Sequence, residues 1–202
     1  LLSRGLGDVY KRQAQVFTGR ERFEPGNPQE GYSPSPQERQ SWLQISYMKE
    51  AYHTMGPKFT LGWMAEALYS SKNFSENYTA TMMQAGEFAP TPHSKLMYNE
   101  AFRANQYVAA GIKPIYVLND MFQFRTEFYG FTPIFPIKKN ALNKAYYGKA
   151  FSRFEYMGEV SVICHLPFGA ISAYVNHYSS PRREWNVGMT IGWQLFNYRF
   201  VE

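Results

Sequence analysis

The chain has 202 residues, of which 45% are hydrophobic, 18% aromatic and only 18% charged. The many aromatic residues exclude an intrinsically disordered chain, and the charged share is below the roughly 25% of ordinary soluble domains. No stretch has the roughly 18 consecutive apolar residues of a membrane helix, which excludes a helical membrane bundle. The net charge of +5 is small and dispersed, so it does not indicate nucleic-acid binding. The single cysteine excludes an internal disulfide framework.

The first 40 residues are not expected to contribute to the fold. Residues 1–13, LLSRGLGDVYKRQ, have no usable periodicity and lack the continuous apolar core of a signal peptide. They resemble translated sequencing-adapter read-through, so we predict that they are not native and that the natural chain extends further upstream. Residues 14–40 are rich in Pro, Gly, Gln and charge, which predicts a long loop.

From Ser41 onward the hydrophobic pattern has a period of two, which is typical of β-strands. No helix or second sheet is predicted. The expected fold is therefore all-β, an antiparallel meander that forms an open, curled sheet with bare edges at its first and last strands. The predicted strands are residues 41–55, 58–71, 106–119, 122–136, 151–166, 170–180 and 185–200.

The alternation places apolar and charged side chains on opposite faces of the strands. In the strand at 122–136, for example, Phe124 and Phe128 alternate with Arg125 and Glu127. The aromatic face is expected to include Trp63, Phe124, Phe154 and Trp193, and the charged face Lys113, Arg125, Glu127, Arg153, Glu155 and Glu159.

Strand lengths and connections favour a transmembrane β-barrel. The predicted strands exceed the roughly five or six residues common in soluble sheets and reach the roughly 9–11 of a tilted membrane strand. Tight turns near residues 56, 120 and 168 alternate with long loops at 14–40, 72–105 and 137–150. Short periplasmic turns and long extracellular loops are typical of outer-membrane barrels, whose lumen would hold the charged face. The alternative is a soluble lipid-binding β-barrel, with the aromatic face turned inward.

The long loop at 72–105 resembles the sixth extracellular loop of the BamA-like superfamily of outer-membrane barrels. In that family the barrel has sixteen strands, and five follow this loop, as five predicted strands follow here. The resemblance implies that the chain holds strands ten to sixteen, and that the loop folds into the lumen as a plug. The family's Arg-Gly-aromatic motif is matched by Arg103, although Ala104 replaces the glycine. The resemblance implies that Arg103 pairs with Glu127 and locks the plug.

The closing segment GMTIGWQLFNYRF resembles the C-terminal strand that the barrel-assembly machinery recognises in outer-membrane proteins. The resemblance assigns this signal to Trp193, Tyr198 and Phe200, and implies the assembly machinery as a partner. The two residues after Phe200 depart from the usual pattern, in which an aromatic residue ends the chain.

Three segments, FRTEFYGFTPIFPIKKN, LPFGAISAYVNHYSSP and WNVGMTIGWQLFNYRF, resemble the barrel half of bacterial patatin-like phospholipases, particularly those of Bacteroidetes. The resemblance implies that residues 41–202 anchor an N-terminal lipase in the outer membrane, and display or export it. It also implies outer-membrane lipid and further strands of the same protein as partners. The alternative is an assembly or secretion barrel without a lipase.

The sequence predicts no catalytic, metal or cofactor site. It lacks the GxSxG motif of a lipase, HExxH and CxxC, and its four histidines are far apart. The chain itself is therefore not expected to be an enzyme. The lumen charges are expected to be solvated or mutually paired, or else to hold the plug. The basic stretch at Lys138, Lys139, Lys144 and Lys149 is expected to be a solvated extracellular loop, or a contact with anionic lipopolysaccharide.

Overall fold

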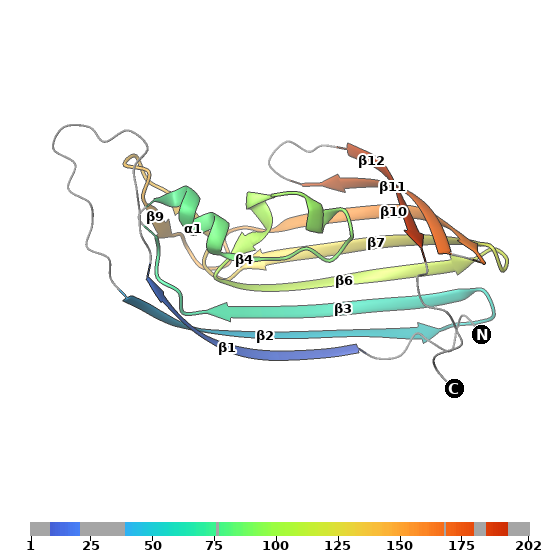
Figure 1. Cartoon of the computed structure of the whole chain (residues 1–202), viewed down its shortest axis with the longest axis horizontal. Helices are drawn as coiled ribbons and strands as arrows, with labels where there is room; N and C mark the ends of the chain where they lie inside the picture. Colours follow the sequence, from blue (N-terminus) through green and yellow to red (C-terminus); the bar gives the residue numbers. More distant parts are fainter. Residues whose placement is uncertain (1–8, 21–38, 76, 168, 180–184, 194–202) are drawn as a thin grey trace.

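The computed structural model of the chain describes residues 9–20, 39–75, 77–167, 169–179 and 185–193. Their main element is a single eight-stranded antiparallel sheet (Figure 1), in which each strand pairs with the strands before and after it in the meander. This confirms the all-β meander. In sheet order the strands are β1 (Val9–Arg20), β2 (Arg39–Thr54), β3 (Phe59–Ser70), β6 (Gln106–Val117), β7 (Phe122–Pro133), β10 (Glu155–Leu166), β11 (Gly169–Tyr178) and β12 (Trp185–Trp193).

The strand β1 corrects the expectation for the first 40 residues. It pairs with β2 from Val9, opposite Glu50, to Arg20, opposite Arg39. Residues 14–20 are therefore not part of a loop, and β1, rather than the strand predicted at 41–55, is the edge of the sheet. Its side-chain alternation is weak, but an edge strand needs only backbone pairing on one side, and β2 is long enough to supply it.

The sheet is open within the described residues, with β1 at one edge and β12 at the other. Figure 1 shows that it is twisted and curved rather than flat. The open, curled sheet is therefore as predicted, with eight strands in place of seven. The last predicted strand is described only as far as Trp193, and residues 194–202 lie outside the described part.

Tight turns join the strands at one end of the sheet, and long connections lie at the other, as the sequence predicts. In the turn between β2 and β3, Gly56 has a φ of 147°, a conformation that other residues rarely adopt. The long connections contain elements that the sequence did not predict. These are α1 (Tyr78–Gln84), β4 (Gly86–Glu87), β5 (Arg103–Ala104), two 3-10 turns (Ser94–Leu96 and Glu100–Phe102), and the hairpin of β8 (Ile137–Lys139) and β9 (Ala145–Tyr147).

The helix α1 contradicts the expectation that the chain contains no helix. Asn77 caps it, because its side-chain oxygen accepts a hydrogen bond from the Ala80 backbone N–H at 2.8 Å. The start of the helix is therefore fixed by local capping. With 7 residues, the helix is too short to show a clear helical period in its hydrophobic residues. Among the described residues, none of the helices has the length and hydrophobicity of a transmembrane helix.

The two faces of the sheet have different surroundings. The connection between β3 and β6, residues 71–105, is here called the covering segment. Its part between Phe88 and Ala104 packs against one face of the sheet, which we call the covered face, and the opposite face is the open face (Figure 1). Phe124 is 42% exposed and Phe154 is 63% exposed on the open face. Trp63 shares that face, because it lies opposite Ile112, which in turn lies opposite Phe128. The predicted separation of aromatic and charged faces is confirmed for these residues.

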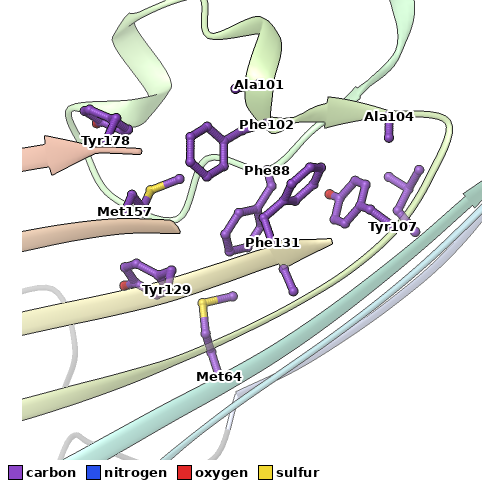
Figure 2. Packing of buried hydrophobic residues seen from close by; sticks show 12 residues of the cluster. Met64, Phe88, Ala101, Phe102, Ala104, Tyr107, Tyr129, Phe131, Met157 and Tyr178 are labelled. Carbon is purple, nitrogen blue, oxygen red and sulfur yellow. The ribbon is translucent and has the colours of Figure 1, made fainter. Parts of the chain in front are cut away.

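The core lies between the covering segment and the sheet. Figure 2 shows the rings of Phe88 and Phe102, from the covering segment, pointing toward Phe131 on β7. The ring centroids of Phe88 and Phe131 are 5.9 Å apart, and those of Phe102 and Phe131 are 5.6 Å apart. Burying a phenylalanine side chain contributes about 1.5–3 kcal/mol, so these two rings supply much of the docking energy of the segment. The core also contains Met64, Leu68, Ala101, Ala104, Tyr107, Ala109, Tyr129, Met157 and Tyr178.

Three tyrosines on the covered face lie over glycines of the neighbouring strand. Tyr129 is directly opposite Gly111, and a Cβ atom on Gly111 would come within 2.1 Å of the Tyr129 ring. The same arrangement joins Tyr52 to Gly62 and Tyr174 to Gly188. A glycine opposite an aromatic residue leaves room for the ring to lie close to the sheet.

Candidate functional site

The covered face is the candidate site, because it brings the predicted lumen charges together on one side of the sheet. Lys113, Arg125, Glu127, Glu155 and Glu159 all lie on this face, and Arg153 reaches it from just before β10. The strands β6, β7 and β10 position these side chains at alternate residues, which is the period that the sequence predicts. The structure therefore groups the predicted charges, but their partners differ from those expected.

The predicted lock between Arg103 and Glu127 does not form. The guanidinium of Arg103 makes an ion pair with Glu87, which lies opposite it in the small two-stranded sheet of β4 and β5. It also donates a hydrogen bond to the Met83 carbonyl at 3.0 Å and lies 4.8 Å from the Tyr98 ring centroid. All of these partners belong to the covering segment. Arg103 thus holds the segment together internally rather than tying it to the sheet.

Glu127 has partners on its own strand. Its Oε1 atom is 2.9 Å from Nε of Arg125, and its Oε2 atom accepts a hydrogen bond from the Tyr129 hydroxyl at 2.5 Å. Residues two apart on a strand project from the same face, so both contacts follow from sequence spacing. Both carboxylate oxygens of Glu127 therefore have partners on the same strand, so its charge is balanced without an ion pair to Arg103.

A polar row crosses the covered face beside Glu127. In register, Glu127 lies opposite Glu159 on β10, and Glu159 lies opposite Asn176 on β11. Glu159 is only 5% exposed, and its carboxylate interacts with the side chains of Asn176 and of Thr91, which belongs to the covering segment. The row therefore groups buried polar side chains next to the covering segment.

The remaining predicted charges are paired. Lys113 is buried and makes an ion pair with Glu50 of β2, whose carboxylate also accepts a hydrogen bond from Tyr52 at 2.5 Å. Arg153 Nε lies 2.8 Å from Glu155 Oε1. These charges therefore pair with one another, as one of the two expectations has it, and they do not hold the covering segment through Arg103.

His93 attaches the covering segment to the far side of the sheet. Its Nδ1 atom lies 2.9 Å from the Tyr178 hydroxyl on β11, and its ring centroid is 5.6 Å from that of Tyr174. Burial lowers the pKa of His93 from its usual value of 6.5, because the charged imidazolium loses hydration there. No pattern in the sequence indicates a role for this residue, since an isolated histidine carries no spacing signal.

The aromatic part of the covered face was also not expected from the sequence. Tyr129 and Phe131 follow the same alternation as Arg125 and Glu127, so they share the charged face. The signal was present in the alternate positions of this strand, but Phe128 and Tyr129 are adjacent aromatic residues on opposite faces. Because these two residues are adjacent, the sequence does not show clearly where the covered face changes from charged to apolar.

The other predicted sites are only partly described. The backbone of Trp193 belongs to β12, opposite Gly169, while its side chain and all of Tyr198 and Phe200 lie outside the described residues. Within the described part, no three His, Cys, Asp or Glu side chains are grouped so that they could hold a metal ion. Cys164 is a free, half-buried thiol.

No protein-family model matches the chain, and neither a curated protein nor a solved structure shows significant similarity to it.

Proposed function

We propose that the chain is part of an outer-membrane β-barrel, with its open face against lipid and its covered face toward the lumen. The observation that carries this proposal is the large exposed apolar surface on a single face of the sheet. Thr126, Val160, Val175 and Val187 lie opposite one another on four neighbouring strands, and each of the three valines is exposed. A monomeric soluble protein rarely exposes a continuous surface of this kind.

The length of the strands supports the same proposal. The strands β3, β6, β7 and β10 have 12 residues each, which is enough for a tilted strand to cross a bilayer core that needs about 9–11. Pairing of β1 and β12 with further strands would satisfy their free backbone groups, as a lipid environment demands. A soluble lipid-binding barrel would instead have its aromatic face inward, opposite to the exposure of Phe124 and Phe154.

Lys49 is a charged residue on the open face. Its ammonium nitrogen lies 5.1 Å from the ring centroid of Trp63 on the neighbouring strand. Such a cation–π contact offsets part of the cost of moving the charge out of water, and the flexible stem lets the ammonium reach toward the membrane surface. The position is therefore compatible with a lipid-facing strand.

The resemblance to patatin-like phospholipases extends the proposal to the parent protein. In this proposal the chain anchors a lipase domain, and displays or exports it, while the covering segment acts as a plug. The sheet contributes the anchor and no catalytic group. The gene region upstream tests this part, because it should encode a patatin-like GxSxG motif in the same reading frame. Periplasmic transport-associated repeats in that place would instead identify an assembly or secretion barrel.

A pair of neighbouring cysteines tests the orientation. In a C164S background, V162C lies on the open face of β10 and I163C on the covered face. With the full chain refolded into phosphatidylcholine vesicles, a spin label at 162 should be more accessible to oxygen, which concentrates in lipid, and a label at 163 to a water-soluble nickel chelate. Circular dichroism checks that both variants fold. Equal access of the nickel chelate to both labels would overturn the membrane proposal.

A further inference from the structure

The connection between β7 and β10 concentrates positive charge at the end of the sheet that carries the long connections. Residues 134–154 contain five basic residues and no acidic one. Arg153 pairs with Glu155, but the other four, Lys138, Lys139, Lys144 and Lys149, are all exposed. None of these four makes an ion pair with another described residue. We call them the hairpin lysines, because they lie on and next to the β8–β9 hairpin.

The hairpin lysines are held in a defined place. The Asn143 carbonyl accepts a hydrogen bond from the Tyr78 backbone N–H of α1 at 2.8 Å, and Ile137 is buried against α1. On the next strand, the Tyr147 hydroxyl accepts a hydrogen bond from Asn105 at 3.1 Å. Figure 1 shows β9 beside α1, beyond the end of the long strands. The charges are therefore presented by a docked hairpin.

Exposed apolar side chains accompany these lysines. Leu142 in the hairpin turn is 79% exposed, and Phe151, just before β10, is 62% exposed. Tyr146 is exposed and lies directly opposite Lys138. Basic side chains mixed with aromatic and aliphatic ones are typical of protein surfaces at a membrane boundary, where the lipid offers phosphate groups above an apolar layer.

We propose that the hairpin lysines bind the phosphate groups of an anionic lipid surface at the boundary of the membrane. This inference rests on the proposed membrane function and assigns the lipid chemistry at the end with the long connections. Lysine ammonium groups bind phosphates as point charges, and four of them without acidic neighbours on the same connection match a surface carrying many phosphates. The exposed Leu142 and Phe151 side chains enter the apolar layer beneath.

Two double variants that remove equal charge test the proposal. The K138Q/K139Q variant removes two hairpin lysines, and K58Q/K95Q removes two exposed lysines from outside the hairpin. Binding of the full chain is measured on vesicles of phosphatidylcholine alone and on vesicles that also contain phosphatidylglycerol. A lysine near an anionic surface contributes about fivefold in affinity, so K138Q/K139Q should weaken binding to the anionic vesicles by about 25-fold at low salt. K58Q/K95Q should change it by less than about threefold.

The outcomes separate this inference from the membrane proposal. Equal weakening by both double variants, or equal affinity for neutral and anionic vesicles, overturns the lipid-phosphate site while leaving the lipid-facing sheet intact. Failure of the chain to associate with either vesicle overturns both. Competition by inorganic phosphate at millimolar concentration would also contradict the inference, because it would indicate a site for the free ion rather than for a lipid surface.

Discussion

At the scale of single residues, the guanidinium of Arg103 finds its partners within the covering segment rather than on the sheet. Glu87 lies opposite Arg103 in the short β4–β5 pairing, and the Met83 carbonyl lies in the same segment. Glu127 meanwhile has Arg125 and Tyr129 on its own strand. Each charge is therefore satisfied within its own segment or strand.

A double-mutant cycle should detect this difference in partners. R103M combined with E87Q should give a coupling energy of about 1 kcal/mol, as for a partly exposed ion pair, whereas R103M combined with E127Q should give a value near zero. The free energy of unfolding, measured by urea titration for each single and double variant, provides both couplings. A coupling with Glu127 larger than that with Glu87 would contradict the structure.

The contact between Gly111 and Tyr129 gives a second prediction at this scale. Replacing Gly111 by alanine would place a methyl group 2.1 Å from the Tyr129 ring and 2.8 Å from the Phe128 carbonyl oxygen. We expect G111A to lower the free energy of unfolding by about 1–3 kcal/mol, the usual cost of overpacking.

Gly158 is the matched control for this variant. It is also a strand glycine, but its nearest neighbour would be 3.7 Å from an added Cβ atom, which is an ordinary contact. The G158A variant should therefore change stability by no more than about 0.5 kcal/mol, as is common for sites without close packing. Equal destabilisation by both variants in urea titrations would show that the close approach at Gly111 is unimportant.

At the scale of elements, the covering segment is held mainly by apolar packing. Phe88 and Phe102 contribute rings to a cluster that includes Met157 and Tyr178, and the Phe102 and Tyr178 centroids are 6.0 Å apart. His93 adds a polar contact at the same strand, through the Tyr178 hydroxyl. The attachment of the segment to the sheet therefore depends on burial and on polar contacts, such as that of His93 and the hydrogen bond from the Tyr107 hydroxyl to the Glu87 carbonyl at 3.2 Å, rather than on the Arg103 ion pair.

The docking of the covering segment should weaken in mild acid. Since burial lowers the pKa of His93 below 6.5, the undocked segment binds a proton before the docked one as the pH falls. The stabilisation of the docked state is fully present above about pH 6.5, the ordinary pKa of histidine. It is lost progressively as the pH falls toward the lower pKa that His93 has in the docked state. After correction for the intrinsic pH dependence of exchange, the amides of residues 88–102 should be less protected at pH 5.5 than at pH 7.5.

A neutral replacement isolates the contribution of His93. The H93Q variant keeps a side chain that can hydrogen-bond with Tyr178 but has no titratable group. Its hydrogen exchange, corrected for the intrinsic pH dependence, should be the same at both pH values. If H93Q retained the full acid response, other groups such as the buried carboxylates would be responsible.

At this scale the strands were predictable and their connections were not. The long strands β2, β3, β6, β7, β10, β11 and β12 largely follow a period of two, which can be recognised from neighbouring residues alone. The helix α1, the β4–β5 pair and the β8–β9 hairpin have few residues, and they are fixed by contacts such as that of Ile137 with Met82. Those partners are far apart in sequence, so no local pattern indicates them.

At the scale of the whole molecule, the two faces of one sheet are in opposite environments. The covered face is filled near the long connections by the rings around Phe131, and its polar row through Glu159 lies closer to the tight turns. The open face keeps Phe124 and Phe154 exposed. This arrangement leads us to propose lipid on one side and a lumen on the other, with the spin-label experiment as its test.

The sequence by itself determined the all-β class, the order of the predicted strands and the face on which most of their residues lie, because these follow from a two-residue period along a single strand. Only the tertiary structure decided which charges pair, that Phe88 and Phe102 cover the inner aromatic residues, and that β1 extends the sheet. These features depend on partners that chain folding brings together from distant positions. Their energies are therefore set by packing and loop closure rather than by local spacing.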